Sequence, residues 1–288
     1  MSYDRRMRIR SSIGVAAVVA LFGCKSKADK QAEIAETDVS HLVKIVGDRH
    51  VDSLPRALPE AASKLTPPLD RAGETFNTLR DKTDDLRSSK RSFFAIVDST
   101  GQIVWVDEPA WPVKGRIVDA GFPPVKDALA GKGSFFRGSG RFGGDPEGAL
   151  IFMDASPIKG ADGKVEGALV AAWEAIDAAE DLQGQLLTEH GMQSATPNVH
   201  NKVKEQHKKA MEEPDTWIAL FRGPTLYFVG DAYQPLEDAS KALDIAGKTA
   251  SGNWKGTFDV ANTTWGGAAA RISGLGPDVG IVVFRHQN

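Results

Sequence analysis

The chain has 288 residues and a formal net charge of −3, and 41% of its residues are hydrophobic. This composition is typical of a globular protein of one or two domains. The near balance of charge gives no basis for nucleic-acid binding, which needs a basic face. The single cysteine excludes an internal disulfide framework and a cysteine-based zinc site.

The first 24 residues have the pattern of a targeting segment. Four arginines between residues 5 and 10 precede an apolar run, residues 13–22, that carries no charge. Ten helical residues rise about 15 Å, half of a bilayer's hydrocarbon core, so this run is too short to span a membrane. We interpret it as the apolar core of a signal peptide.

The apolar run ends in Leu21, Phe22, Gly23 and Cys24. This ending resembles the lipobox of bacterial lipoproteins, in which a leucine and a small residue precede the cysteine; Phe22 departs from the small residue usual at its position. The resemblance implies cleavage before Cys24 and acyl chains on its thiol, which anchor a protein stably to a membrane. By the same family's rule, Lys25 favours the outer membrane over the inner one. The alternative is a cleaved secretory signal with an incidental cysteine.

Cleavage changes the charge of the protein. The first 24 residues hold four arginines and one aspartate, so the remainder has 31 basic and 37 acidic side chains, a net charge of −6. No later segment approaches 18 consecutive apolar residues. We therefore expect an exported body that faces the periplasm or the cell surface and carries no cytoplasmic domain.

Residues 25–91 are polar and helical in character, and we expect a helical stalk with N-terminal helices here. Apolar residues recur at helical spacing in the first part of the segment. Pro55 and Pro59 interrupt the pattern. Pro67 and Pro68 are expected to open a second helix, residues 69–90, because proline suits a first helical turn.

From residue 92 the pattern changes to short strands and turns. The apolar and β-branched runs predict five strands, with a short helix at residues 124–130 between the second and the third. The expected strands are residues 93–97, 102–107, 134–142, 149–154 and 165–176. Asp162 and Gly163 predict a tight hairpin turn before the last strand. We expect an antiparallel five-stranded sheet with flanking helices in a module at residues 92–190.

The same order of elements returns near the C-terminus, after polar helical residues 177–213, and this predicts an internal duplication. The expected helix is at residues 235–243. The expected strands are residues 217–221, 226–229, 253–260, 264–272 and 279–284. The predicted fold class is therefore α+β, with a second, shorter module at residues 191–288.

Three stretches of the first module carry a family resemblance: residues 94–104, 125–133 and 156–170. They resemble PAS-like modules and, with the preceding helix, the export signal and the tandem arrangement, the extracellular Cache sensor family. The resemblance implies a double Cache sensor that binds a small ligand. The aromatic and arginine-rich motif of its amino-acid-binding members is absent, although Trp111 lies in the right region, so amino-acid recognition is not supported.

In such a module the ligand pocket lies between the sheet and the helical crossing. We expect Trp105, Trp111, Arg137, Asp154 and Trp173 to line it, because aromatic walls with a few polar groups are typical of small-molecule pockets. The alternative is that the tryptophans fill the core and that Arg137 and Asp154 form a cross-strand ion pair. In the second module, the run of residues 265–270 has small side chains after Trp265, and these either open space or let a helix pack closely.

No nucleophile elbow, phosphate loop or zinc-protease motif occurs, and we expect a protein that is not an enzyme and has no cofactor or metal. His200 and His207 lie seven residues apart, too far for a joint metal site on a helix, and we expect a solvated face there. The sequence favours a lipid-anchored envelope sensor that binds a small ligand or a partner and passes the signal to another protein. The alternative is a structural or interaction lipoprotein without a pocket.

Overall fold

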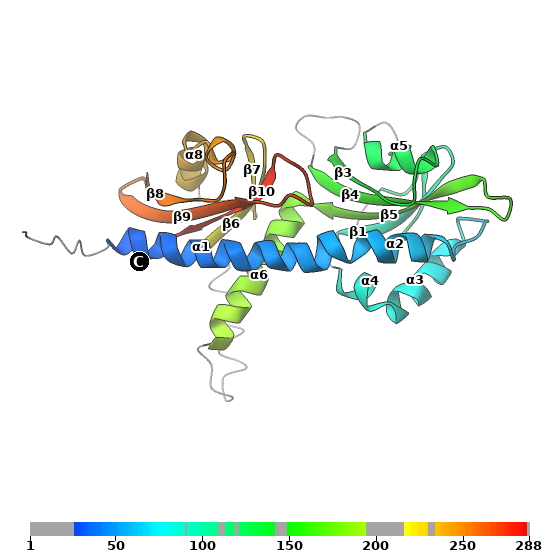
Figure 1. The fold of residues 1–288 in the computed structure, drawn as a ribbon, viewed down its shortest axis with the longest axis horizontal. Coiled ribbons are helices and arrows are strands. Elements are labelled where there is room, and N and C mark those ends of the chain that lie inside the picture. Colours follow the sequence, from blue (N-terminus) through cyan, green and yellow to red (C-terminus); the bar gives the residue numbers. More distant parts are fainter. Residues whose placement is uncertain are drawn as a thin grey trace, which may run out of the picture.

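The computed structural model describes residues 26–89, 91–108, 113–118, 121–141, 149–193, 216–229 and 234–286. The chain forms two β-sheets that lie one after the other along the long axis of the molecule (Figure 1). Helices from the N-terminal part cover one face of both sheets, and each sheet carries short helices of its own module on the other face (Figure 1). Cys24 and the three residues before it lie outside the described residues, as do His200 and His207.

An almost continuous series of helices runs past both sheets (Figure 1). We call it the helical run: α1 (Lys27–Val46), the π-helix η1 (Gly47–Asp52) and α2 (Leu54–Ala62). Ser26 starts α1 with a capping box, in which its hydroxyl accepts from the Asp29 amide at 3.1 Å and Asp29 accepts from the Ser26 amide at 3.0 Å. The segment expected as a stalk therefore packs along the body of the protein.

The two prolines expected to interrupt the first helical pattern both lie inside α2. Pro55 occupies the first turn, where no intrahelical N–H bond is needed. Pro59 lacks one N–H donor, and the helix tolerates this loss because burial of the neighbouring Leu54 and Leu58 side chains holds it against the core. The second expected helix is in fact two, α3 (Ala72–Lys82) and α4 (Asp84–Ser88), because the backbone of Thr83 is extended.

The first sheet has the strand order β2-β1-β5-β4-β3, with every neighbouring pair antiparallel. Its strands are β1 (Phe93–Asp98), β2 (Ile103–Val106), β3 (Phe136–Gly140), β4 (Ile151–Lys159) and β5 (Val165–Glu174). Helix α5 (Pro123–Leu129) connects β2 to β3. The prediction of a five-stranded antiparallel sheet is confirmed, and β4 runs five residues further than expected.

The second sheet repeats the topology of the first, with the order β7-β6-β10-β9-β8. Its strands are β6 (Thr216–Arg222), β7 (Thr225–Phe228), β8 (Trp254–Val260), β9 (Thr263–Arg271) and β10 (Val279–Arg285), and its helices are α8 (Gln234–Ala242) and α9 (Ile245–Lys248). In both sheets the first and last strands of the module pair at the centre. The duplication inferred from the sequence is therefore present in the fold.

Helix α1 lies directly on β9. A Cβ atom on Gly266 would lie 2.2 Å from the backbone nitrogen of Ala32, so only glycine allows this approach. Ala268 and Ala270 are buried beneath the same helix and belong to the core cluster that contains Leu42. The small side chains of β9 therefore let α1 pack closely on the sheet. Of the two alternatives for this run, open space or close helix packing, the structure shows the second.

Helix α6 (Ala175–Gln193) links the two sheets. It begins directly after β5, packs on β6 and β7, and then passes α1 and extends beyond it (Figure 1). His41 of α1 pairs with Glu189 of α6 at 2.6 Å. Helix α6 thus brings the end of the first sheet, the second sheet and the helical run together at one junction.

Candidate functional site

Five side chains form a buried polar centre at this junction. We call it the junction network, and it consists of His50, Arg91, Arg137, Asp154 and Trp173. Arg137 and Asp154 face each other across β3 and β4. The Nε and Nη2 atoms of Arg137 donate to the two carboxylate oxygens of Asp154 at 2.6 and 3.0 Å. Arg91 donates to Asp154 from a second side at 3.2 Å.

Arg137 also connects the first module to the rest of the chain. Its Nη2 donates to the carbonyl of His50 at 2.7 Å, and its Nη1 donates to the carbonyls of Val51 at 3.1 Å and Gly274 at 3.5 Å. The first two carbonyls belong to the π-helix, and Gly274 lies between β9 and β10 of the second module. One guanidinium group therefore contacts both modules and the helical run.

His50 and Trp173 form the aromatic part of the network. Their rings stack, with centroids 3.9 Å apart and an interplanar angle of 17°. Arg91 Nη1 lies 2.6 Å from His50 Nδ1, and because a guanidinium only donates, Nδ1 accepts here. The Arg91 guanidinium also lies over the Trp173 ring, 5.5 Å from its centroid.

Burial sets the electrostatics of the network. It lowers the pKa of Arg91 to about 10, the charge of Arg137 acts in the same direction, and Asp154 opposes both. Arg91 therefore stays cationic at neutral pH although its side chain is only 4% exposed. Buried charges are tolerated when they are paired and hydrogen-bonded, as Asp154 is by two arginines.

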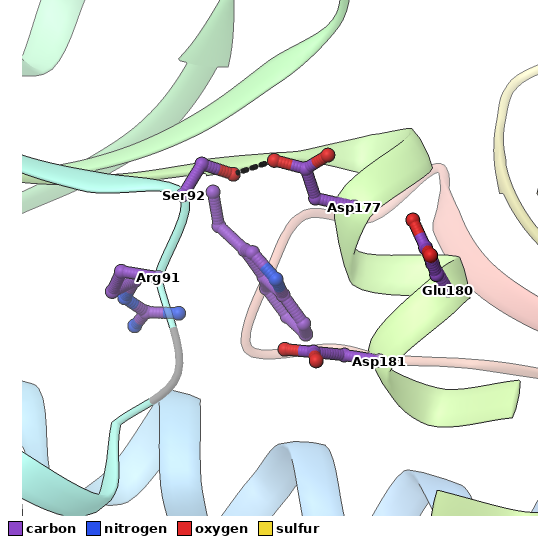
Figure 2. A pocket seen from close by; sticks show the side chains of 6 residues that line it. Arg91, Ser92, Asp177, Glu180 and Asp181 are labelled. Atoms are coloured by element: carbon purple, nitrogen blue, oxygen red, sulfur yellow. Dashed lines mark hydrogen bonds between the residues drawn. The ribbon is translucent and has the colours of Figure 1, made fainter. Parts of the chain in front are cut away.

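A cavity of about 310 Å³ adjoins the network. We call it the junction pocket, and its lining residues are Arg91, Ser92, Trp173, Asp177, Glu180 and Asp181. Figure 2 shows Arg91 and Ser92 on one side and the three carboxylates, all from the first two turns of α6, on the other. The Ser92 hydroxyl donates to Asp177 at 2.5 Å and accepts from the amide of Glu174 at 2.9 Å.

The residues that line the junction pocket include two with unsatisfied buried donors and three with carboxylates. Arg91 Nε and Trp173 Nε1 are buried and lack a hydrogen-bond acceptor among the described residues. Such orphan donors are costly, and a ligand or a water molecule that brings an acceptor would satisfy them. Burial raises the pKa of Glu174, and the charge of Asp177 adds to this effect. The pocket therefore suits a small polar ligand with an acceptor for the buried N–H groups and a donor for the α6 carboxylates.

The structure brings together three of the five residues that we expected to line a pocket. Arg137, Asp154 and Trp173 meet in the junction network, on the sheet face toward the helical run, and the cross-strand ion pair is present. Trp105 lies apart from them, beside Phe76 of α3 with ring centroids 5.7 Å apart. Trp111 lies outside the described residues.

Sequence reasoning missed His50 and Arg91. His50 has no neighbouring metal-ligand or catalytic motif in the sequence, and Arg91 directly precedes the first strand without a recognisable motif. The hydrogen bond between them joins residues 41 positions apart. Only the packing of η1 against the first sheet brings the two side chains together.

The opposite face of the first sheet, toward α5, is apolar. Phe93, Ile151 and Met153 of the sheet pack there with Phe122 and Val125. Two glycines of β3 let this layer close onto the sheet, because a Cβ on Gly140 would lie 2.1 Å from the carbonyl oxygen of Gly121 and one on Gly138 would lie 2.8 Å from Pro124. These described residues form an apolar core layer between the sheet and α5.

Solved structures with a similar fold are found for this chain, although family models and curated proteins give no match. A domain of a sensory box/GGDEF family protein from Vibrio parahaemolyticus is 10% identical and has a TM-score of 0.50, covering 91% of this chain and 98% of that one. This likeness agrees with the sheet topology, and the chain has the tandem PAS-like, or double Cache, fold.

Two further solved structures are similar. The extracellular ligand-binding receptor of Desulfohalobium retbaense is 17% identical with a TM-score of 0.49, over 86% of this chain and 39% of that one, so the chain spans about two fifths of that receptor's length. The ligand-binding domain of the Pseudomonas aeruginosa amino acid chemoreceptor PctC, in complex with GABA, is 14% identical with a TM-score of 0.47, over 91% of this chain and all of that one. In the part of the chain that the structure describes, no helix has the length and apolarity to cross a membrane.

Proposed function

We propose that the protein is a lipid-anchored, extracytoplasmic sensor that binds a small polar ligand in the junction pocket and passes the signal to an envelope partner protein. The observation that carries the proposal is the junction pocket itself. It joins two buried donors without acceptors, on Arg91 and Trp173, to a wall of carboxylates. The double Cache fold and the lipobox-like ending at Cys24 support an extracytoplasmic role.

The hydrogen bonds of Arg91 connect the junction pocket to the helical run and to the second module. An acceptor that draws the Arg91 guanidinium toward the pocket would weaken its bonds to Asp154 and His50. Asp154 holds Arg137, and Arg137 contacts the π-helix and Gly274 of the second module. Occupancy of the pocket would therefore change how the two modules are held together, and a partner could sense that change.

Native mass spectrometry of the protein purified from its own envelope tests ligand binding. We expect a small-molecule adduct on the wild type, with lower occupancy for Glu180→Gln because this substitution removes one carboxylate from the pocket wall. Glu74→Gln is the matched control, since Glu74 is an exposed glutamate on α3, away from the junction. An adduct that persists unchanged in Glu180→Gln would place the ligand elsewhere, and its absence from the wild type would count against the proposal.

The anchor has its own test. We expect Cys24→Ala to release the protein from membranes, because the acyl chains on the thiol would no longer form. Fractionation of cells, followed by the intact mass of the membrane-bound protein, measures this. Unchanged fractionation, or a wild-type mass without acyl groups, would argue against lipidation.

A second candidate function is a structural or interaction lipoprotein that has kept the fold without a ligand. The apolar layer under α5 favours it, because apolar side chains pack on the face where we expected a polar pocket. Chemical crosslinking in cells separates the two functions. A stable envelope partner captured equally by the wild type and by Glu180→Gln, with no small-molecule adduct on either, would favour this second candidate.

A further inference from the structure

We infer that the free edge of the first sheet binds an extended, acidic segment of a partner protein, which adds a strand beside β3 in a cavity between the two modules. We call this space the inter-module cavity, and it has a volume of about 460 Å³. The inference rests on the partner protein of the proposed function. It adds the surface that binds the partner and the kind of segment that fits there.

The inter-module cavity runs along the backbone edge of β3. Four consecutive residues of this strand, 136–139, line it. Successive side chains of a strand point to opposite faces of the sheet. Phe136 packs in the apolar layer toward α5, whereas Arg137 binds Asp154 on the other face. A cavity that contacts residues from both faces therefore lies beside the strand, where a further strand would add.

The outer side of β3 is open. The strand is last in the order of the first sheet and pairs only with β4. At every second residue of such an edge strand, the N–H and C=O groups point away from the sheet. Among the described residues, no hydrogen bond from outside the sheet reaches the backbone of residues 136–140. The described part of the chain thus leaves these groups available to another extended chain.

The other three sheet edges carry features that hinder strand addition. Strands β2 and β7 have only four residues each, and the register between β1 and β2 shifts at Ile96 and Val97. Strand β8 presents Lys255 and Asp259, and charged side chains on an edge oppose pairing with another chain. Strand β3 pairs in a regular register and contains neither lysine nor proline. It is therefore the least protected of the four edges.

The opposite wall of the inter-module cavity belongs to the second module. It is the loop of residues 273–278 between β9 and β10, which reaches toward the first sheet (Figure 1). Gly274 packs so closely on η1 that an added Cβ atom would lie 2.2 Å from Val51 Cγ1, and its carbonyl accepts from Arg137 at 3.5 Å. The helical run thus holds this wall in place. A change in the junction network would alter the width of the cavity and so the binding of the segment.

The charges that line the cavity favour an acidic segment. Asp127 is already paired with Lys132 at 2.6 Å. Among the described residues, the Arg222 guanidinium has only a loose pairing with Asp278 at 3.6 Å, and its side chain is 38% exposed. A carboxylate on the added strand would give this guanidinium a charge-assisted hydrogen bond. An apolar side chain of the same strand would meet Phe136 on the α5 side.

Phage display of seven-residue peptides on the purified full-length protein in detergent tests the site, with Arg222→Glu as the counter-target. We expect sequences that alternate apolar and acidic residues. Their binding to Arg222→Glu, measured by fluorescence anisotropy, should be about tenfold weaker, because a hydrogen bond to a charged group is lost. Arg56→Glu is the matched control and should bind like the wild type, since Arg56 is an exposed arginine paired with Asp85 outside the cavity.

A milder variant guards against a folding defect. Arg222→Gln removes the charge without adding repulsion, so it replaces Arg222→Glu if the melting temperature of the latter falls below that of Arg56→Glu. The loss of peptide binding should then again be about tenfold. Equal binding of the selected peptides to the wild type and to Arg222→Gln would overturn the assignment of an acidic segment to this cavity.

N-methylation of a selected peptide tests the mode of binding. A peptide that pairs as a strand presents every second N–H to β3. Methyl groups placed at one position after another should therefore abolish binding at alternate positions and leave it nearly unchanged at the positions between. Tolerance of the methyl group at every position would overturn strand addition.

Two further outcomes would overturn the inference. One is the selection of no peptide that prefers the wild type to Arg222→Glu. The other is a concentration-dependent dimer of the wild type that Arg222→Glu abolishes, which would assign the edge of β3 to a second copy of this chain. Neither measurement involves the anchor at Cys24 or a ligand in the junction pocket, so a failure here is distinct from a failure of the proposed function.

Discussion

At the scale of single residues, Asp154 is a buried carboxylate held by two arginines. Its side chain is 6% exposed, and Arg137 binds it through both carboxylate oxygens. Removing one partner of a buried ion pair leaves a charge without compensation and costs about 3–5 kcal/mol. Here the loss of the Arg137 guanidinium would also leave the carbonyls of His50 and Val51 without their hydrogen-bond donor.

We therefore predict that Arg137→Met lowers the free energy of unfolding by about 3 kcal/mol, as measured by urea denaturation followed by circular dichroism. Arg87→Ala is the control, because the Arg87–Asp84 pair is exposed on α4 and contributes about 0–1 kcal/mol. Similar losses in the two variants would show that the junction network contributes no more than a surface ion pair.

Asp107 gives a prediction about pH. Burial raises the pKa of its carboxyl, while the Phe94 amide, which donates to it at 2.6 Å, and Arg80 oppose this shift. A carboxyl whose pKa is higher in the folded protein than in the unfolded chain stabilises the fold below the unfolded pKa, and this contribution is lost as pH rises through the folded pKa. The stability of the wild type relative to Asp107→Asn should thus be greater at pH 4 than at pH 7. Urea denaturation of both proteins at pH 4 and pH 7 measures this difference in the free energy of unfolding. A difference that grows in favour of the wild type toward pH 7 would contradict the raised pKa of Asp107.

The sequence identified three of the five residues of the junction network. Arg137 and Asp154 were expected on neighbouring strands, and Trp173 on the last strand of the same module, because alternation along strands determines which side chains share a face. The partners from the helical run could not be found in this way. Arg137 contacts Val51 across 86 positions of sequence, and the π-helix that exposes this carbonyl has no sequence signature.

At the scale of elements, the contact between α1 and β9 depends on one glycine. A Cβ atom on Gly266 would meet the backbone of α1 at Ala32, Gln31 and Ala28 within 2.7 Å, so the helix would have to move. Overpacking of this kind typically costs about 1–3 kcal/mol. We predict that Gly266→Ala lowers the melting temperature.

Gly184 provides the matched control for that prediction. It lies inside α6, and nothing stands within 4 Å of the position of an added Cβ. Gly184→Ala should raise stability by about 0.5–1 kcal/mol, because alanine loses less backbone entropy in a helix. Differential scanning calorimetry of both variants checks the pair of results, and a neutral Gly266→Ala would mean that α1 is free to shift on the sheet.

Strands were easier to predict than helices in this chain. Apolar and β-branched runs between turn residues located every strand of both sheets, with the largest error of five residues at the end of β4. The prediction of one continuous helix over residues 69–90 was wrong. The apolar stripe continues past Thr83, but the helical backbone is interrupted there and forms two helices. The short α9 was missed because four residues carry too little periodicity to be detected.

At the scale of the whole molecule, two copies of one topology share a single N-terminal helical run and one connecting helix. The junction pocket lies where these parts meet, next to a network that contacts both modules. A ligand there can change the relation between the modules with few new contacts. Coupling of this kind requires that the ligand binds one arrangement better than another.

The most direct test of this account is a thermal-shift titration of the lipidated protein in detergent against small polar metabolites that carry both an acceptor and a cationic group. A ligand that binds only the folded state at 100 times its dissociation constant stabilises it by about 2.7 kcal/mol. We predict that at least one compound raises the melting temperature of the wild type and of Glu74→Gln by several degrees, with a much smaller rise for Glu180→Gln. No shift of the wild type with any compound, or equal shifts in all three proteins, would contradict a ligand site in the junction pocket.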